Sequence, residues 1–258
     1  MFEKIKCFIL DMDGTIYLGN ELFSYTKEFL KKVDETGRKY YFFKNNSSKS
    51  QQDYIEKLEK FGIRIKNQQM MTSTHVISRY LKQHYEGKSV YVVGTPSLIQ
   101  EFQYFGINVT EEDPDIVVLG FDTTLTYEKL SKACHYIRNG CIYFGINPDW
   151  NCPMEGGAFI PDCGSIAKLI EASTGRFPEF FGKPSKHTLD YIIQKTGYEP
   201  DEIAIVGDRM YTDIAVADQS DVMSILVLSG ESTREDVKTS DVKPNVILED
   251  LSEITKML

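Results

Sequence analysis

The sequence predicts an α/β fold in which parallel strands alternate with crossover helices and the chain forms two domains. Short apolar runs that end in polar turns recur along the chain, and amphipathic segments stand between them. This alternation repeats more often than one ordinary sheet needs, and a chain of 258 residues is long enough to bury two α/β cores. Neither a repeat nor an obvious linker places the border between the domains.

The first strand is expected at residues 7–10, where a wholly apolar run stops before Asp11 and Gly14 permits a turn. An amphipathic helix follows at 24–35, and a second apolar run at 40–43 leads into a polar cluster. The later elements follow the same rhythm. Strands are expected at 89–93, 115–119, 141–144, 179–181, 203–206 and, as the last one, 223–228, and helices from about 50, 73, 98, 127, 165 and 185. The Gly- and Pro-rich stretch between 146 and 165 is expected to be a loop or a short hairpin.

Composition narrows the class of partner. Hydrophobic residues make up 41% of the chain and charged residues 26%, which is typical of soluble globular proteins and argues against disorder. The formal net charge of -9 disfavours nucleic acid and anionic membranes as partners. We therefore expect a small ligand, with a local cation or metal wherever that ligand is anionic.

Cysteine usage and hydropathy suggest a cytoplasmic protein. The five cysteines form no C-x-x-C pair and are odd in number, which fits neither a disulfide framework nor a zinc ribbon. No apolar run approaches the roughly 20 residues of a membrane span, and the N-terminal run is interrupted by acids too early for a signal peptide.

Polar side chains follow four of the expected strands. In chain order these are Asp11 and Asp13, residues 44–48, Lys183, and Asp208 with Asp213. In a parallel sheet such strand ends meet at one edge, where ligands bind. Carboxylates crowded there would repel one another, and a hard divalent cation with oxygen ligands such as Mg²⁺ would resolve the conflict.

These motifs resemble the haloacid dehalogenase-like (HAD) superfamily of phosphohydrolases. D-M-D-G-T at 11–15, G-K-P at 182–184 and G-D-R-M-Y-T-D at 207–213 are similar, in order, to its first, third and fourth motifs. N-N-S-S at 45–48, the long insertion that follows it, P-D-C-G-S and V-L-S-G resemble its subfamily IIA, the N-acetylglucosamine-operon phosphatase and p-nitrophenylphosphatase-like group. The resemblance covers essentially the whole chain.

The resemblance implies a role for each matching residue. Asp11 would be the nucleophile that forms an aspartyl-phosphate, and Asp13 the general acid and then the general base. Mg²⁺ would be held by Asp11, the main-chain carbonyl of Asp13, and Asp208. Lys183 would supply a fixed positive charge to the nucleophile and the phosphoryl oxygens, and Asp213 would support it.

Position 44 departs from the family pattern. Lys44 stands where the second motif has Thr or Ser, so an ammonium replaces a hydroxyl donor. Two outcomes are open: Lys44 contacts phosphate, with the main-chain N–H groups of Asn45 and Asn46 completing the cradle, or it pairs with an active-site carboxylate and lowers turnover.

The resemblance also implies the domain plan, a Rossmann-like core at 1–82 and 179–258 with an inserted α/β cap of the C2 type at 83–178. Specificity would then reside in the cap, where the 147–164 loop offers four candidates to face the substrate, namely Asp149, Trp150, Met154 and Glu155. Trp150 either stacks on a sugar or base or packs the hairpin. A homodimer through the cap is a further expectation from the family.

The function expected is Mg²⁺-dependent hydrolysis of small phosphorylated metabolites such as sugar phosphates or nucleoside monophosphates. The rivals are a HAD phosphotransferase, which the large cap disfavours, and a non-catalytic phosphometabolite-binding protein, for which Lys44 would be the first sign of decay. A dehalogenase is disfavoured further, because Asp13 and Asp208 would have no evident purpose in it.

Overall fold

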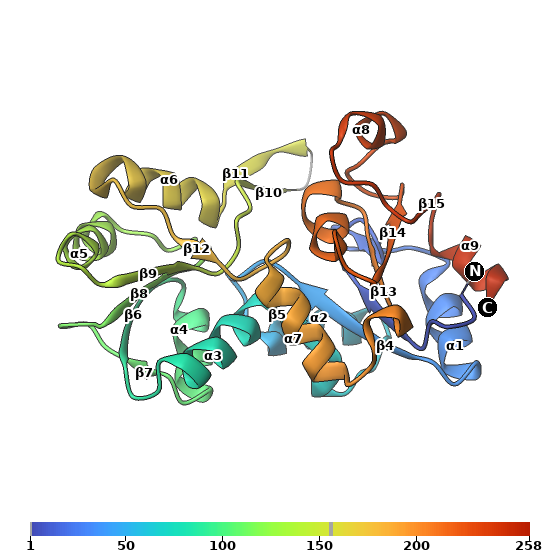
Figure 1. Cartoon of the computed structure of the whole chain (residues 1–258), viewed down its shortest axis with the longest axis horizontal. Helices are drawn as coiled ribbons and strands as arrows, with labels where there is room; N and C mark the ends of the chain where they lie inside the picture. Colours follow the sequence, from blue (N-terminus) through green and yellow to red (C-terminus); the bar gives the residue numbers. More distant parts are fainter. Residues whose placement is uncertain (1, 155–156) are drawn as a thin grey trace. The chain divides into compact units, whose positions relative to one another are not determined.

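The computed structural model describes residues 2–154 and 157–258 and divides the chain into two compact units. Unit 1 comprises Met1–Lys44, Ile55–Met71 and Lys183–Leu258, and unit 2 comprises Asn45–Tyr54 and Thr72–Gly182. Parallel sheets flanked by helices make up both, which confirms the predicted fold class (Figure 1).

The boundaries of the two units agree only in part with those of the predicted core and cap domains. Residues 45–54, 72–82 and 179–182 belong to unit 2, whereas the sequence predicts them in the core. One reason is local bonding: the main-chain N–H of Gln51 donates to Glu101, and both residues lie in unit 2. The functional border between core and cap stays a prediction.

Unit 1 contains a sheet in the order β15-β14-β13-β1-β4-β5. Its strands are β1 (Cys7–Leu10), β4 (Lys39–Lys44), β5 (Met70–Thr72, whose last residue is assigned to unit 2), β13 (Ile203–Gly207), β14 (Met223–Val227) and β15 (Val246–Leu248). β1 lies between β4 and β13, pairs in parallel with both and is buried along its whole length. This central position explains why residues 7–10 are all apolar.

Helices and a small antiparallel pair complete unit 1. They are β2 (Tyr17–Leu18), β3 (Glu21–Leu22), α1 (Thr26–Glu35), α7 (Lys186–Thr196), α8 (Arg234–Thr239) and α9 (Leu251–Met257), while α2 (Gln51–Lys60) begins in unit 2 and continues into unit 1. α1 buries Phe29, Leu30 and Val33, spaced as one face of a helix requires, and packs against α9.

Unit 2 contains a second parallel sheet, in the order β12-β9-β8-β6-β7. Its strands are β6 (Ser89–Val93), β7 (Asn108–Val109), β8 (Ile116–Leu119), β9 (Ile142–Gly145) and β12 (Glu179–Phe180), its helices α3 (Ser73–His84), α4 (Pro96–Tyr104), α5 (Tyr127–Arg138) and α6 (Cys163–Thr174). Val117 and Leu119 of β8 pack with Ile137 of α5 and Ile170 of α6 in one apolar core.

The expected loop between 146 and 165 contains a hairpin, β10 (Asn151–Pro153) with β11 (Phe159–Pro161). Here α6 begins at Cys163 instead of Ser165, because the Asp162 carboxylate accepts the N–H of Cys163 and caps the helix. The strand predicted at 223–228 is present as β14, but the prediction that it is the last strand is wrong, since β15 follows it. Among the described residues, no helix is both long and apolar enough to cross a membrane.

Candidate active site

The register of the unit 1 sheet brings three strand ends together. Leu10 at the end of β1 stands opposite Phe42 of β4 and Val206 of β13. The residues that follow leave the sheet at one edge, so Asp11 and Asp208 emerge side by side. The sheet thereby produces the convergence that the sequence predicts for these two acids.

Lys183 lies buried between two of the acids. Its Nζ donates to Asp11 Oδ1 at 2.6 Å and to Asp213 Oδ1 at 2.5 Å, and it also reaches the main-chain oxygen of Phe43 at 3.4 Å. Burial alone would lower the pKa of Lys183, but the two carboxylates raise it above its usual value. The lysine is therefore a fixed positive charge at this edge of the sheet.

Asp208 is held in a narrow slot between two glycines. A Cβ atom on Gly230 would lie 2.0 Å from Asp208 Oδ2, and one on Gly14 would lie 2.3 Å from the same oxygen. The main-chain N–H of Glu231 donates to Oδ2 at 2.7 Å. The other carboxylate oxygen, Oδ1, is buried without a hydrogen-bond partner. An acceptor of this kind is costly to bury unless a cation or donor meets it.

Asp11, Asp208 and Asp213 form a group that fits a metal ion, with one oxygen of each within 4.8 Å of the others. Burial, and after it the charges of Asp11 and Asp213, raise the pKa of Asp208 to about 8. Burial also opposes ionisation of Asp11, but Lys183 and Lys44 hold the pKa of Asp11 below its usual value. Lys183 pairs with Asp11 and Asp213, so a hard divalent cation bound through oxygen suits the remaining negative charge and the unpaired Oδ1 of Asp208.

Replacing Gly230 with alanine tests whether the slot positions Asp208. The added methyl group would collide with the carboxylate, so the affinity for Mg²⁺ is expected to fall by about 10- to 100-fold, as for groups that orient a metal ligand. Calorimetric titration with Mg²⁺ measures it without any substrate. Gly94→Ala in unit 2 is the control, because its Cβ would meet a Leu98 methyl at 2.5 Å and no acid. Equal Mg²⁺ affinity in both variants would contradict the assignment.

Lys44 pairs with a carboxylate, which is one of the two outcomes left open by the sequence. Its Nζ lies 3.4 Å from Asp13 Oδ2, and the main-chain N–H of Gly19 donates to Asp13 Oδ1 at 3.4 Å. The Asp13 side chain is 36% exposed and that of Lys44 only 13%. The acid is therefore accessible beside a largely buried cation.

The loop after β14 supplies partners that sequence reasoning missed. The Ser229 hydroxyl donates to the main-chain oxygen of Gly14 at 2.7 Å, and the main-chain N–H of Ser232 donates to that of Asp208 at 3.0 Å. Arg209 Nε lies 2.9 Å from a carboxylate oxygen of Glu231. V-L-S-G at 227–230 is only a family likeness, and neither it nor G-D-R-M-Y-T-D, which contains Arg209, gives a role to Arg209 or Glu231.

The remaining candidates lie in unit 2. Asn45 and Asp149 are buried and bonded to each other, and Asn46 accepts the N–H of Ser48. Trp150 and Met154 lie about half exposed on the hairpin, at 50% and 49%. Glu155, the fourth residue of the predicted specificity set, lies outside the described residues.

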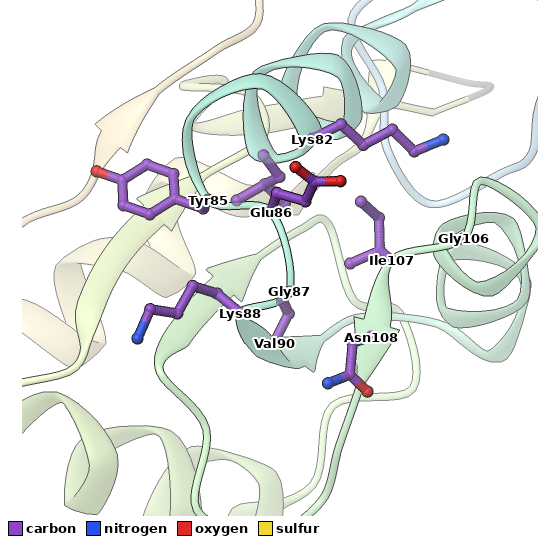
Figure 2. Close-up of a pocket in the computed structure, with 10 residues that line it drawn as sticks. Lys82, Tyr85, Glu86, Gly87, Lys88, Val90, Gly106, Ile107 and Asn108 are labelled. Carbon is purple, nitrogen blue, oxygen red and sulfur yellow. The ribbon is translucent and has the colours of Figure 1, made fainter.

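Unit 2 also has a pocket of about 280 Å³ at the loop that connects α3 to β6 (Figure 2). Lys82, Tyr85, Lys88 and Asn108 are among the residues that line it. Lys88 is paired with Asp115 at 2.8 Å. None of the predicted site residues lines this pocket.

Comparison with known proteins agrees with the geometry. Residues 8–108 match a family model described as haloacid dehalogenase-like hydrolase, and residues 180–254 match a HAD-hydrolase-like model. The acid sugar phosphatase of Staphylococcus aureus (strain MRSA252) is 33% identical over 252 residues, 97% of each chain. The solved structure of 4-nitrophenylphosphatase from Thermotoga maritima is 42% identical with a TM-score of 0.95, covering 99% of this chain and 98% of that one. NagD from E. coli K-12 is 31% identical with a TM-score of 0.88, covering 96% and 98%.

Proposed function

We propose that this chain, which belongs to the haloacid dehalogenase-like hydrolase family, is a Mg²⁺-dependent phosphatase of small phosphorylated metabolites that works through an aspartyl-phosphate at Asp11. The observation that carries the proposal is the buried Lys183, shared by Asp11 and Asp213 beside the orphaned oxygen of Asp208. This arrangement supplies an ionised carboxylate nucleophile, a fixed cation and a metal ligand at one strand edge.

Mg²⁺ would be held by Asp11, Asp208 and the main-chain carbonyl of Asp13, and when bound it would neutralise charge on the transferring phosphoryl group. Lys183 adds a second positive charge beside the nucleophile and needs no proton transfer to do so. Asp213 holds the ammonium from its other side, which fixes its direction.

The reaction needs two steps of displacement at phosphorus. In the first, the Asp11 carboxylate forms a bond to phosphorus while the bond to the leaving oxygen breaks, and Asp13 gives that oxygen a proton. In the second, Asp13 takes a proton from water, the water oxygen bonds to phosphorus, and the bond from phosphorus to Asp11 breaks. The side chain of Asp13 is more exposed than that of Asp11, which suits a group that exchanges protons with substrate and water.

One observation favours the second candidate, a weakly active or non-catalytic phosphometabolite-binding protein. Lys44 Nζ lies 3.4 Å from Asp13 Oδ2, so the side chain proposed as the general acid is already engaged in an ion pair. The same lysine can also draw a phosphate into the site, where Asn45 and Asn46 are the other proposed phosphate-binding residues. Retained hydrolysis is the first choice because Asp11 and Asp208, the proposed nucleophile and metal ligand, lie with Lys183 at one edge of the sheet.

The substrate class follows from the relatives and stays a proposal for this chain. The similar proteins are named for acid sugar phosphatase and nitrophenylphosphatase activities, which favours a sugar phosphate over a nucleoside monophosphate. The hairpin with Trp150 and Met154 is the proposed specificity surface, in a cap at 83–178, through which we also propose a homodimer. Free cysteines at all five positions support a cytoplasmic location.

Phosphate release across a substrate panel tests the proposal. The panel contains sugar phosphates, nucleoside monophosphates, phosphoglycolate, glycerol phosphate, pyridoxal phosphate and p-nitrophenyl phosphate, each with Mg²⁺ and with a chelator. We expect turnover with Mg²⁺ that the chelator abolishes, highest for a sugar phosphate. Binding of a phosphorylated ligand without any metal-dependent turnover would favour the binding protein instead.

A further inference from the structure

The chain passes between the two units at four points, and three of these meet at one side chain. The passages lie after residues 44, 54, 71 and 182. Asn45 stands at the first, and its Oδ1 accepts a hydrogen bond from Ser73, just past the third, at 2.8 Å. A Cβ atom on Gly182, at the fourth, would lie 2.4 Å from the same Oδ1. Asn45, Ser73 and Gly182 all belong to unit 2.

A buried carboxylate fixes the other end of the Asn45 amide. Asn45 Nδ2 donates to Asp149 Oδ2 at 2.7 Å, and Asn147 Nδ2 donates to the same oxygen at 2.8 Å. Asn147 is in turn bonded to Asp162 at 2.9 Å and to Ser47 at 2.7 Å. Asp149 is only 6% exposed, so the donors of this network, and not solvent, satisfy its charge.

The passages held in this way lead directly to two residues of the proposed site. Lys44 precedes Asn45 in the chain, and Lys183 follows Gly182. Asn45 and Gly182 are in close contact within unit 2. This contact therefore fixes the points at which the chain leaves unit 2 towards Lys44 and towards Lys183. The close approach of Gly182 to Asn45 leaves no room for a side chain at position 182, so the two segments pack directly against each other within unit 2.

We propose that Asp149 is a positioning residue that acts through Asn45 on Lys44 and Lys183, and not a group that meets the substrate. This differs from the specificity role expected of Asp149 from the sequence, and it rests on the proposed phosphatase function. A node of hydrogen bonds that orients groups of the reaction should affect the rate of the chemical step more than substrate binding.

The variant Asp149→Asn tests the inference with little change in shape. The new amide is uncharged and has one acceptor oxygen in place of two, so the hydrogen bonds from Asn45 and Asn147 are weakened and that from Asn45 is lost where the amide turns its NH₂ towards it. With p-nitrophenyl phosphate and Mg²⁺ we expect kcat to fall about 10- to 100-fold while KM changes less than about threefold. Hydrogen exchange should quicken at the main-chain amides of residues 45–48 and 181–183, a readout that does not depend on activity.

Asp122→Asn is the matched control. Asp122 is a buried carboxylate of the same unit, and it accepts hydrogen bonds from Lys129 at 2.7 Å and Thr124 at 2.8 Å, none of them at a passage. We expect it to destabilise the protein in a thermal melt but to keep the wild-type kcat and the exchange rates at 45–48 and 181–183. A fall in kcat as large in Asp122→Asn as in Asp149→Asn would overturn the inference.

A second variant decides the matter where Asp149→Asn fails to fold. Ser73→Ala removes the hydroxyl that donates to Asn45 Oδ1, the end of the amide that does not contact Asp149. Like Asp149→Asn, it should lower kcat and speed hydrogen exchange at residues 45–48. Unchanged kcat and exchange in this variant would overturn the inference. A wild-type protein without metal-dependent turnover would instead refute the proposed function, and the exchange data would still decide whether Asp149 anchors these segments.

Discussion

Asp11→Asn is expected to abolish turnover while leaving the fold intact. An amide is a poor nucleophile towards phosphorus, so kcat should fall by about 10⁴-fold or more, as for enzymes that lose their nucleophile. The substitution should not unfold the protein, because Asp213 keeps its contact with Lys183 at 2.5 Å. Burial is the main cause of the raised pKa of Asp208, and removing the charge of Asp11 relieves the part that is due to repulsion.

Phosphate release and thermal denaturation, measured on the same preparation, check both parts of this expectation. Asp122→Asn again serves as the control, since it makes the same chemical change in a buried acid far along the chain from the motifs. A variant of Asp11 that keeps more than about a tenth of the wild-type kcat would remove Asp11 from the nucleophile role.

Lys183→Met is expected to damage both stability and activity. The methionine fills a similar volume, but Asp11 and Asp213 lose the ammonium that each contacts within 2.6 Å. Breaking a buried ion pair by removing one partner costs about 3–5 kcal/mol of unfolding free energy. The loss of the fixed charge beside the nucleophile should also lower kcat by about 10³-fold.

The stability effect of Lys183→Met should depend on pH in a defined direction. Lys183 holds the pKa of Asp11 below its usual value, so the ion pair stabilises the fold above the unfolded pKa of aspartate, about 4. This stabilisation is lost as the pH falls through the lower, folded-state pKa of Asp11. Urea denaturation of the wild type and the variant should therefore differ most near neutral pH and converge in acid. A difference that grew on acidification would contradict the ion-pair assignment.

The sequence predicts the centre of the fold well because apolar runs and their polar ends are local signals. The register that sets Leu10 beside Phe42 and Val206 is what such runs produce in a parallel sheet, and it brings Asp11 and Asp208 to one edge as expected. The family resemblance, based on D-M-D-G-T, G-K-P and G-D-R-M-Y-T-D, is confirmed by both family models.

Other features depend on contacts that no local pattern encodes. The slot around Asp208 requires Gly14 and Gly230 to approach it from distant parts of the chain. β15 and α9 were missed because their runs are short, three residues at 246–248 and seven at 251–257, and follow a polar segment. Asp149 stood in a loop rich in Gly and Pro, where sequence gives no sign that its carboxylate is buried against Asn45.

Position 44 shows how a residue type alone can leave its role open. The sequence allowed Lys44 to meet phosphate or a carboxylate, and the structure pairs it with Asp13. That contact is compatible with either proposed function, because a phosphate entering the site would compete for the same ammonium. Only a kinetic measurement decides how strongly the pairing restrains the acid.

Phosphorylation of Asp11 during turnover is the central claim, and chemical trapping tests it most directly. The protein is mixed with p-nitrophenyl phosphate and Mg²⁺, quenched with sodium borohydride, which reduces an acyl phosphate to an alcohol, and digested for mass spectrometry of the peptide that contains residue 11. The prediction is homoserine at position 11 in the wild type, absent with chelator and in Asp11→Asn. Rapid phosphate release with residue 11 left as aspartate, or with reduction at another carboxylate, would contradict the claim.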